Sequence, residues 1–359
     1  FFGHRCKPES VPISNCDQEG RISVAGELSV LLQAWERFRC TSSHVHFQFL
    51  LREDSPTVAS HRFSMTGSER VHKLIGLASD IAAGESDAES IGFLGQALVQ
   101  TTLPHSDPGV PYFERSSGAV SLSIIANPKF GLPFGTVPRL LLAWICTEAV
   151  RTKSPVLGLG RSQNEFLRKL GMRTDGRDCL RLRTQSLKLF SSMLSITYQI
   201  EGRYGLKNMP IADEAFVLWD PHRPDDRMLW ESSLRLSNSF FKNITDSPVP
   251  IDMRVLRALS KSPLAMDIYS WLVYRIFLLR VKNRPGVMIP WTALKLQFGA
   301  DYGDSPRGLI DFKKRFLLRL KEAQLFYPEA NATPQDAGLF VGASRLHTRH
   351  TGSAKLSRL

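Results

Sequence analysis

Residues 156–190 read VLGLGRSQNEFLRKLGMRTDGRDCLRLRTQSLKLF. The short apolar run at the start predicts a strand. Ser162 and Glu165 form a capping box that begins a short helix, and Gly171 suits the end of that helix. The spacing of apolar residues then predicts a longer, basic helix from Asp178 to Ser192. A strand followed by two helices with a tight turn between them therefore forms the centre of the fold.

The elements on either side complete this arrangement. Residues 136–151 predict a preceding helix, with Thr136 as its N-cap. Residues 194–200 and 215–220 predict two later strands, and residues 234–236 a further short one. Helix, strand, helix, helix, strand, strand is the order of a winged-helix domain, a helix-turn-helix variant with a β-hairpin wing.

The same order occurs a second time, between residues 263 and 341. The expected elements are a helix at 263–279, a strand at 287–289, helices at 291–298 and 307–323, and strands at 325–328 and 338–341. We therefore predict an α+β, mainly helical fold with two tandem winged-helix domains. The first spans residues 65–245 with its N-terminal helices, and the second spans residues 246–342.

The flanking segments give weaker patterns. Residues 66–100 predict two helical pieces broken near Gly84, and residues 112–115 and 120–126 predict a strand pair. The chain starts with Phe1 and its first methionine is Met65. We therefore expect residues 1–64, a poorly defined segment, to be disordered, part of a longer protein or upstream of the native start. Residues 343–359 predict a disordered basic tail.

The net charge is +12, and its distribution points to a polyanionic partner. Residues 1–135 hold 11 basic against 14 acidic side chains. Residues 136–207 hold 13 against 5, and residues 252–325 hold 14 against 6. The positive charge therefore lies in two blocks, each of which contains one expected winged helix. Two DNA-binding modules would account for this arrangement.

The third helix of each module is the expected DNA-reading element, because in this motif it enters the major groove. Its inward stripe is predicted to be Leu180, Leu187, Phe190 and Leu194 in the first module, and Leu309, Phe312, Phe316, Leu320 and Ala323 in the second. The candidate DNA-binding residues are Arg177, Arg181, Arg183, Thr184, Gln185, Lys188, Arg307, Lys313, Lys314, Arg315 and Lys321.

Several other classes of protein find little support. The five cysteines form no CxxC pair, which favours a reducing cytoplasm over a disulfide framework. No apolar run is long enough to span a membrane. The chain has no Gly-Lys dipeptide, so a Walker phosphate loop is absent. We expect a protein that is not an enzyme and has no cofactor and no metal site.

Several stretches resemble the plasmid-encoded replication initiators of the RepA C-terminal type. They are residues 131–144, 147–154, 102–105, 181–183, 246–252 and 262–265, and the similarity covers roughly residues 66–341. The resemblance implies binding to repeated double-stranded sites in a plasmid origin, local duplex opening, and recruitment of host replication proteins such as the replicative helicase. It also implies a possible homodimer and no membrane partner.

Three alternatives remain open. A transcriptional repressor would need the same DNA surface, so the residues alone do not separate it from an initiator. The motif His44-Val45-His46 matches the metal pair of rolling-circle nucleases, but none of the seven tyrosines has the lysine four residues later that such nucleophiles typically have. A zinc site at Cys40, His44 and His46 would need a fourth ligand at an unusual spacing.

Overall fold

The computed structural model describes residues 67–84, 90–118, 120–200, 203–220, 222–226, 231–299 and 302–348. These residues all belong to one unit of the chain, which spans residues 49–355. The expectations for residues 1–64, including the motif at His44 and His46, lie outside the described residues. So does most of the predicted tail after residue 348.

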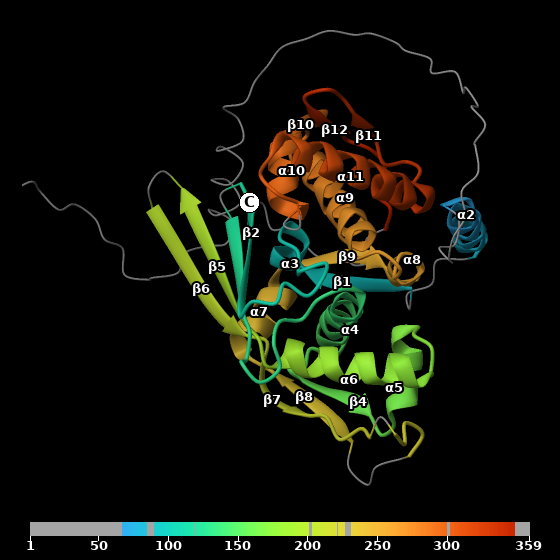
Figure 1. Ribbon diagram of the computed structural model, residues 1–359, viewed down its shortest axis with the longest axis vertical. Helices are drawn as coiled ribbons and strands as arrows, with labels where there is room; N and C mark the ends of the chain where they lie inside the picture. Colours follow the sequence, from blue (N-terminus) through green and yellow to red (C-terminus); the bar gives the residue numbers. More distant parts are fainter. Residues whose placement is uncertain are drawn as a thin grey trace, which may run out of the picture. The chain divides into compact units, whose positions relative to one another are not determined.

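The first set of helices and strands follows the predicted order. It consists of α4 (Thr136–Thr152), β4 (Val156–Gly160), α5 (Gln163–Leu170), α6 (Gly176–Phe190), β7 (Ala212–Phe216) and β8 (Ser232–Leu236). The three strands form an antiparallel sheet in the order β4-β8-β7. Helix α5 contacts both β4 and α6, and α4 contacts α6, as can be followed in Figure 1.

The second set repeats this topology. It consists of α9 (Pro263–Val281), β10 (Gly286–Pro290), α10 (Trp291–Phe298), α11 (Pro306–Phe326), β11 (Ala332–Pro334) and β12 (Gly338–Gly342). The sheet order is β10-β12-β11, so the last strand again lies between the other two (Figure 1). The two sets therefore share both the order of elements along the chain and the order of strands in the sheet.

A second antiparallel sheet, in the order β2-β3-β5-β6, combines two strands that precede the first set with two strands inserted in it between α6 and β7. Its strands are β2 (Tyr112–Ser117), β3 (Val120–Ile125), β5 (Met193–Ile200) and β6 (Arg203–Pro210). The predicted pair at residues 112–115 and 120–126 is confirmed as β2 and β3. The prediction that residues 194–200 form a wing strand is wrong, because β5 pairs with β3 and β6 instead.

Two short strands connect segments that lie far apart in the sequence. Strand β1 (Ile91–Gly95) pairs antiparallel with β9 (Pro248–Asp252) across the predicted boundary at residue 245. Residues 91–95 were expected to be helical, and pairing with β9 is the reason they are not. The remaining helices are α2 (Gly67–Ala83), α3 (Gln96–Gln100), α7 (Asn238–Asp246) and α8 (Met253–Ala258).

Hydrogen-bonded caps fix the helix termini around α5 and α6. The Ser162 hydroxyl accepts a hydrogen bond from the Glu165 amide at 3.2 Å, as the capping box predicts. Gly171 ends α5 in the left-handed region at φ 70°, where a side chain would be strained. The N-cap of α4 is Gly135, without a side-chain cap, so the prediction of Thr136 is wrong by one residue.

Each set has its own aromatic core. Phe166 of α5 is fully buried between Trp144, at 4.8 Å between ring centroids, and Trp219, at 5.1 Å. In the second set Phe316 of α11 contacts Trp291, Phe298 and Phe312. The inward faces of α5 and α11 are therefore fixed by ring packing, which also fixes the faces they turn outward.

The end of the second set differs from the sequence prediction. Residues 325–328, expected to be a strand, contain the last turn of α11 and its C-cap Tyr327, and β11 begins only at Ala332. Residues 343–348 fall within the expected tail, yet they pack against the body. The His347 ring lies 4.7 Å from that of Tyr327, and its Nδ1 lies 2.9 Å from the hydroxyl oxygen of Tyr269.

Candidate nucleic-acid interface

Helix α6 begins at a hydrogen-bonded cap that sets the direction of its side chains. The Asp175 carboxylate accepts a hydrogen bond from the Asp178 amide at 2.8 Å. This bond is the main reason that the pKa of Asp175 is lowered. The buried side of the helix contains Cys179, Leu182, Ser186, Leu189 and Phe190.

The opposite side of α6 faces solvent and is mainly basic. Arg177, Arg181, Arg183 and Thr184 are exposed, and Arg181 donates a hydrogen bond to Asp178 at 2.8 Å. Leu180 also belongs to this side, with 58% of its surface exposed. Its predicted place in the inward stripe is therefore wrong. The leucines at positions 180, 182, 187 and 189 point to different sides of the helix. The sequence alone therefore does not determine which side of α6 is buried.

Two predicted residues of α6 contact the protein itself. The Gln185 side chain is buried, and its Oε1 accepts a hydrogen bond from the Phe134 amide at 3.0 Å. The Lys188 side chain is only 13% exposed; its ammonium group lies 4.6 Å from the centroid of the Phe134 ring and 3.4 Å from a carboxylate oxygen of Asp107. Both residues fasten α6 to the loop that precedes α4.

Helix α11 has the same division into a buried and an exposed side. Its N-cap is Ser305, whose hydroxyl accepts from the Gly308 amide at 3.2 Å. Phe312, Phe316, Leu320 and Ala323 are buried, as predicted, and Leu309 is half-buried. The exposed side carries Arg307, Ile310, Asp311, Lys314, Arg315 and Lys321.

Lys313 and Arg319 lie at the border of this exposed side. The Lys313 ammonium group lies 4.9 Å from the centroid of the Trp291 ring. Arg319 is paired with the buried Glu322, which also accepts a hydrogen bond from Arg70 of α2 at 3.0 Å. The far end of α11 is thus held by α2, whereas its first half presents exposed basic side chains, of which Arg307 lies 4.0 Å from Asp311.

The two helices match when they are compared from their N-caps, Asp175 and Ser305. Two residues after the cap is an exposed arginine (Arg177, Arg307), and five residues after it is an exposed aliphatic residue (Leu180, Ile310). The ninth residue is exposed and polar in both cases (Thr184, Lys314). The seventh, eleventh and fifteenth are buried in both: Leu182, Ser186 and Phe190 in α6, and Phe312, Phe316 and Leu320 in α11.

A hollow of about 500 Å³ lies beside the first half of α6. One wall is formed by Gly176, Leu180 and Arg183 of the helix. The other wall belongs to the loop after β7 and contains Trp219, Asp220 and His222. The hollow therefore lies between the start of α6 and the segment that joins β7 to β8.

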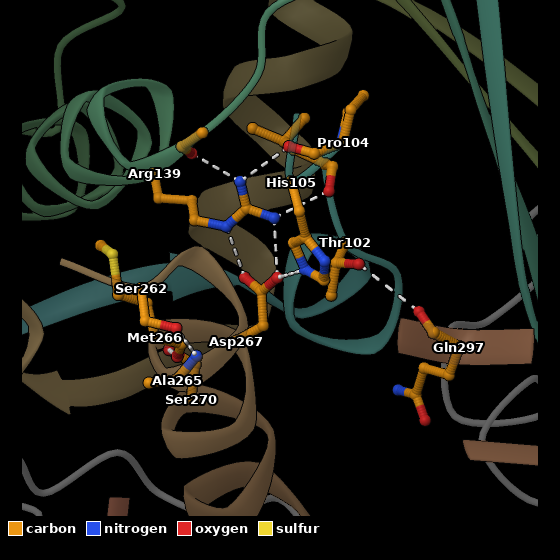
Figure 2. A network of polar contacts seen from close by, with 12 residues as sticks. Thr102, Pro104, His105, Arg139, Ser262, Ala265, Met266, Asp267, Ser270 and Gln297 are labelled. Atoms are coloured by element: carbon orange, nitrogen blue, oxygen red, sulfur yellow. Dashed lines mark hydrogen bonds and ion pairs between the residues drawn. The ribbon is translucent and has the colours of Figure 1, made fainter. Parts of the chain in front are cut away.

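A buried ion pair connects the first helices of the two sets, α4 and α9 (Figure 2). Arg139 of α4 donates two hydrogen bonds to Asp267 of α9, Nε to Oδ1 and Nη2 to Oδ2, both at 2.7 Å. Its other donors reach the carbonyl oxygens of Leu103, Pro104 and Gly135 at 2.6–3.1 Å. The guanidinium is therefore fully hydrogen-bonded although it is almost completely buried.

His105 completes this cluster. Its Nε2 lies 2.8 Å from Oδ2 of Asp267. Burial would raise the pKa of Asp267, but the Arg139 guanidinium and hydrogen bonds from His105 and Arg139 hold it below its usual value. Because the carboxylate only accepts, His105 Nε2 carries the hydrogen. Burial lowers the pKa of His105, and the hydrogen bond with Asp267 opposes this only in part.

The neighbouring residues of the same loop extend the connection to α10. The Thr102 hydroxyl donates to the carbonyl oxygen of Gln297 at 3.4 Å (Figure 2). The Gln297 amide in turn donates to the carbonyl oxygen of Gln100 at 2.7 Å. Residues 102–105, picked out from the sequence only by a resemblance, thus link both sets of elements. Their role was not predictable from spacing, because their partners lie over 150 residues later.

Neither a membrane helix nor a metal site is found in the part of the chain that the structure describes. No helix there is long and apolar enough to cross a bilayer. Nor do the same residues contain a group of three or more His, Cys, Asp or Glu side chains placed to hold a metal ion.

The chain matches one protein family and several chains of solved structures, among them two of RctB. No curated protein matches the chain in sequence. A crystal structure of selenomethionine derivatives of domain 2 and domain 3 of RctB is 12% identical, with a TM-score of 0.44, and covers 71% of this chain and 97% of that chain. A second structure of RctB domains 2–3 is also 12% identical, with a TM-score of 0.41, over 68% and 94% of the two chains.

The family match begins just before α4 and ends within α10, so it includes α6 but stops short of α11. It is also shorter than the stretch of residues 66–341 over which the sequence suggested a resemblance. Within those limits the predicted resemblance is confirmed: residues 132–293 match the family described as plasmid encoded RepA protein.

Proposed function

We propose that this chain is a plasmid replication initiator that binds repeated double-stranded DNA sites at an origin through two winged helices. In this proposal α6 and α11 enter successive major grooves, and the protein acts by binding, without catalysis. The observation that carries it is the pair of equivalent exposed faces, on helices that occupy the same place in two sets whose topology is the same apart from the inserted β5 and β6. The family match over residues 132–293 supports the same conclusion.

Charge and chemistry of the two faces fit this role. Arginine and lysine are the side chains that bind phosphates and guanine edges, and both faces carry several of them. Each face also has one carboxylate next to an arginine: Asp178 beside Arg181 and Asp311 beside Arg307. We assign the DNA contacts to Arg177, Arg181, Arg183, Thr184, Arg307, Lys313, Lys314, Arg315 and Lys321. Gln185 and Lys188 are given a positioning role, because their polar groups contact the loop at Phe134.

The proposal also includes duplex opening, recruitment of a host helicase, and a homodimer at some stage. These steps follow from the class of protein, not from a feature of the described residues. A transcriptional repressor would share the DNA-binding step but not the opening step. Reactivity of thymines toward permanganate in a supercoiled plasmid separates the two, since only an initiator would make A·T-rich DNA beside its sites reactive.

The first test is binding to duplex fragments tiled across the DNA that flanks the gene, at two salt concentrations, with unrelated duplex as the reference. Tight, salt-sensitive binding confined to a fragment with direct repeats is expected. Arg177→Ala and Arg307→Ala should each weaken it. Arg235→Ala removes the same charge from the exposed face of β8 and should have little effect. Equal, weak binding to every fragment would refute the proposal.

A further inference from the structure

We infer that Leu180 and Ile310 are specificity-determining residues, each of which contacts the 5-methyl group of a thymine in the major groove. The inference rests on the proposed function, since it requires α6 and α11 to face duplex DNA. The inference identifies thymine as the base that each helix selects. Neither the charges of the two faces nor the family match identifies a base.

The first observation is the exposure of these two side chains. Leu180 is 58% exposed and Ile310 is 66% exposed, although both occur on helices whose other faces bury several apolar residues. A single exposed aliphatic residue is ordinary on a protein surface and needs no explanation. Here, however, the two occupy the same place, five residues after the N-caps Asp175 and Ser305.

The second observation concerns the polar residues that flank each of these aliphatic side chains on its helix. Arg177 precedes Leu180 by three residues and Thr184 follows by four, so all three lie on one face of α6. Arg307, Ile310 and Lys314 have the same spacing on α11. Each aliphatic side chain is therefore flanked by groups that donate hydrogen bonds to phosphates or bases. A protein partner recognised by burial would need a wider apolar patch than Leu180 forms on α6, or than Ile310 and the 44% exposed Leu318 form on α11.

The major groove offers one apolar group to such a side chain. Adenine, guanine and cytosine present hydrogen-bonding atoms there, whereas thymine adds a methyl group at C5. An aliphatic residue between two polar ones, near the start of the helix, can cover that methyl group while its neighbours bind polar atoms. Asp311 lies beside Ile310 and is 4.0 Å from Arg307, so this part of α11 also presents a hydrogen-bond acceptor.

The test starts from the duplex site that the wild-type protein selects from random sequence. Each thymine in that site is replaced singly by deoxyuridine, which removes the methyl group and leaves every hydrogen-bonding atom in place. We expect about a fourfold loss of affinity at one or more thymines, the change that ~0.8 kcal/mol for a buried methyl group gives. Other thymines should tolerate the replacement.

Variants assign the sensitive thymines to the two helices. Leu180→Ala should abolish the uracil effect at one thymine and Ile310→Ala at another, because the partner of the methyl group is gone. Both residues are largely exposed, so these truncations should leave the fold intact. Leu206→Ala is the matched control, since Leu206 is 67% exposed on β6, outside both helices. It should retain the full wild-type pattern.

The outcomes separate the inference from the proposed function. Sequence-selective binding with no sensitivity to deoxyuridine would overturn the inference and leave the proposed function standing. The same holds if Leu180→Ala and Ile310→Ala keep the wild-type sensitivity. Failure to bind any duplex, or binding without sequence selection, would overturn both.

Discussion

Asp267 accepts both of its guanidinium hydrogen bonds from Arg139 at 2.7 Å, and through them α9 is joined to α4. Each of these helices is the first of its set, and each contacts the third helix of that set, α11 or α6. The pair therefore lies one helix away from both candidate DNA-reading faces. Removal of this ion pair should therefore lower the stability of the fold more than it weakens DNA binding.

We expect Asp267→Ala to lower the free energy of unfolding by about 3–5 kcal/mol, because it leaves the Arg139 guanidinium buried without its counter-charge. Urea denaturation followed by circular dichroism measures this change. Glu214→Gln, which removes one partner of the exposed pair with Arg235 at 3.2 Å, should cost only about 0–1 kcal/mol. Similar, small losses in both variants would show that the buried pair contributes little.

Acid should destabilise the protein through His105, beginning near neutral pH. The folded pKa of His105 is lowered from 6.5, mainly by burial, so below that pH the unfolded chain binds a proton that the folded chain does not. The free energy of unfolding therefore falls as the pH drops from 6.5 toward the folded pKa. His347, whose pKa burial also lowers, acts in the same direction.

His105→Gln isolates this contribution, because glutamine can still donate to Asp267 but does not titrate. Denaturation curves between pH 7 and pH 5 should give a smaller slope for the variant than for the wild type. The slope that remains is assigned to His347. An unchanged slope would mean that His105 gains a proton equally well in the folded and unfolded chain.

Gly171 should resist substitution far more than Gly176, although only five residues separate them. Gly171 has a φ of 70°, and an added Cβ would lie 2.7 Å from Cδ of Arg257. Alanine there should cost about 1–2 kcal/mol from the backbone alone. Gly176 is the first residue of α6, and an added Cβ there would meet no atom within 4 Å other than its chain neighbours and the helix's own backbone, so Gly176→Ala is the control. Thermal unfolding of both variants tests this contrast.

Much of the fold was predictable because its signals are local. The capping box at Ser162, the end of α5 at Gly171 and the order of elements in both sets depend on residues close together in the sequence. The strand β1 was missed because the residues that make it a strand, Pro248–Asp252, come about 150 residues later. The insertion of β5 in the β2-β3-β5-β6 sheet was missed for the same reason.

The candidate site was predicted in composition but not in detail. The sequence predicts that the third helix of each set carries arginine and lysine. It does not predict which side of α6 is buried. Leu180 and Cys179 are adjacent and both apolar, and only the tertiary structure, in which Cys179 contacts Gln163 and Asn164 of α5, decides which one is buried. Gln185 was likewise predicted to contact DNA, but in the structure its side-chain oxygen accepts a hydrogen bond from the Phe134 amide.

Arg181 should distinguish specific from non-specific DNA. It is half-exposed on the outward side of α6, and Asp178 holds its guanidinium at 2.8 Å. If it reaches a base edge, Arg181→Ala should weaken binding to the selected site by about 1–3 kcal/mol while binding to unrelated duplex changes little. Titrations with both duplexes at one salt concentration decide this. An equal loss on the two DNAs would make it a phosphate contact.

Lys314 should instead act through the salt dependence of binding. It is exposed on α11, and no aromatic or acidic side chain among the residues that the structure describes pairs with its ammonium group, so a phosphate is its natural ligand. Lys314→Ala should reduce the slope of log Kd against log salt by about one, since one phosphate contact releases close to one counterion. Lys188→Ala removes the same charge from a side chain only 13% exposed, and its slope should remain that of the wild type. An equal reduction in both variants would mean that net charge, not a contact at Lys314, governs the salt dependence.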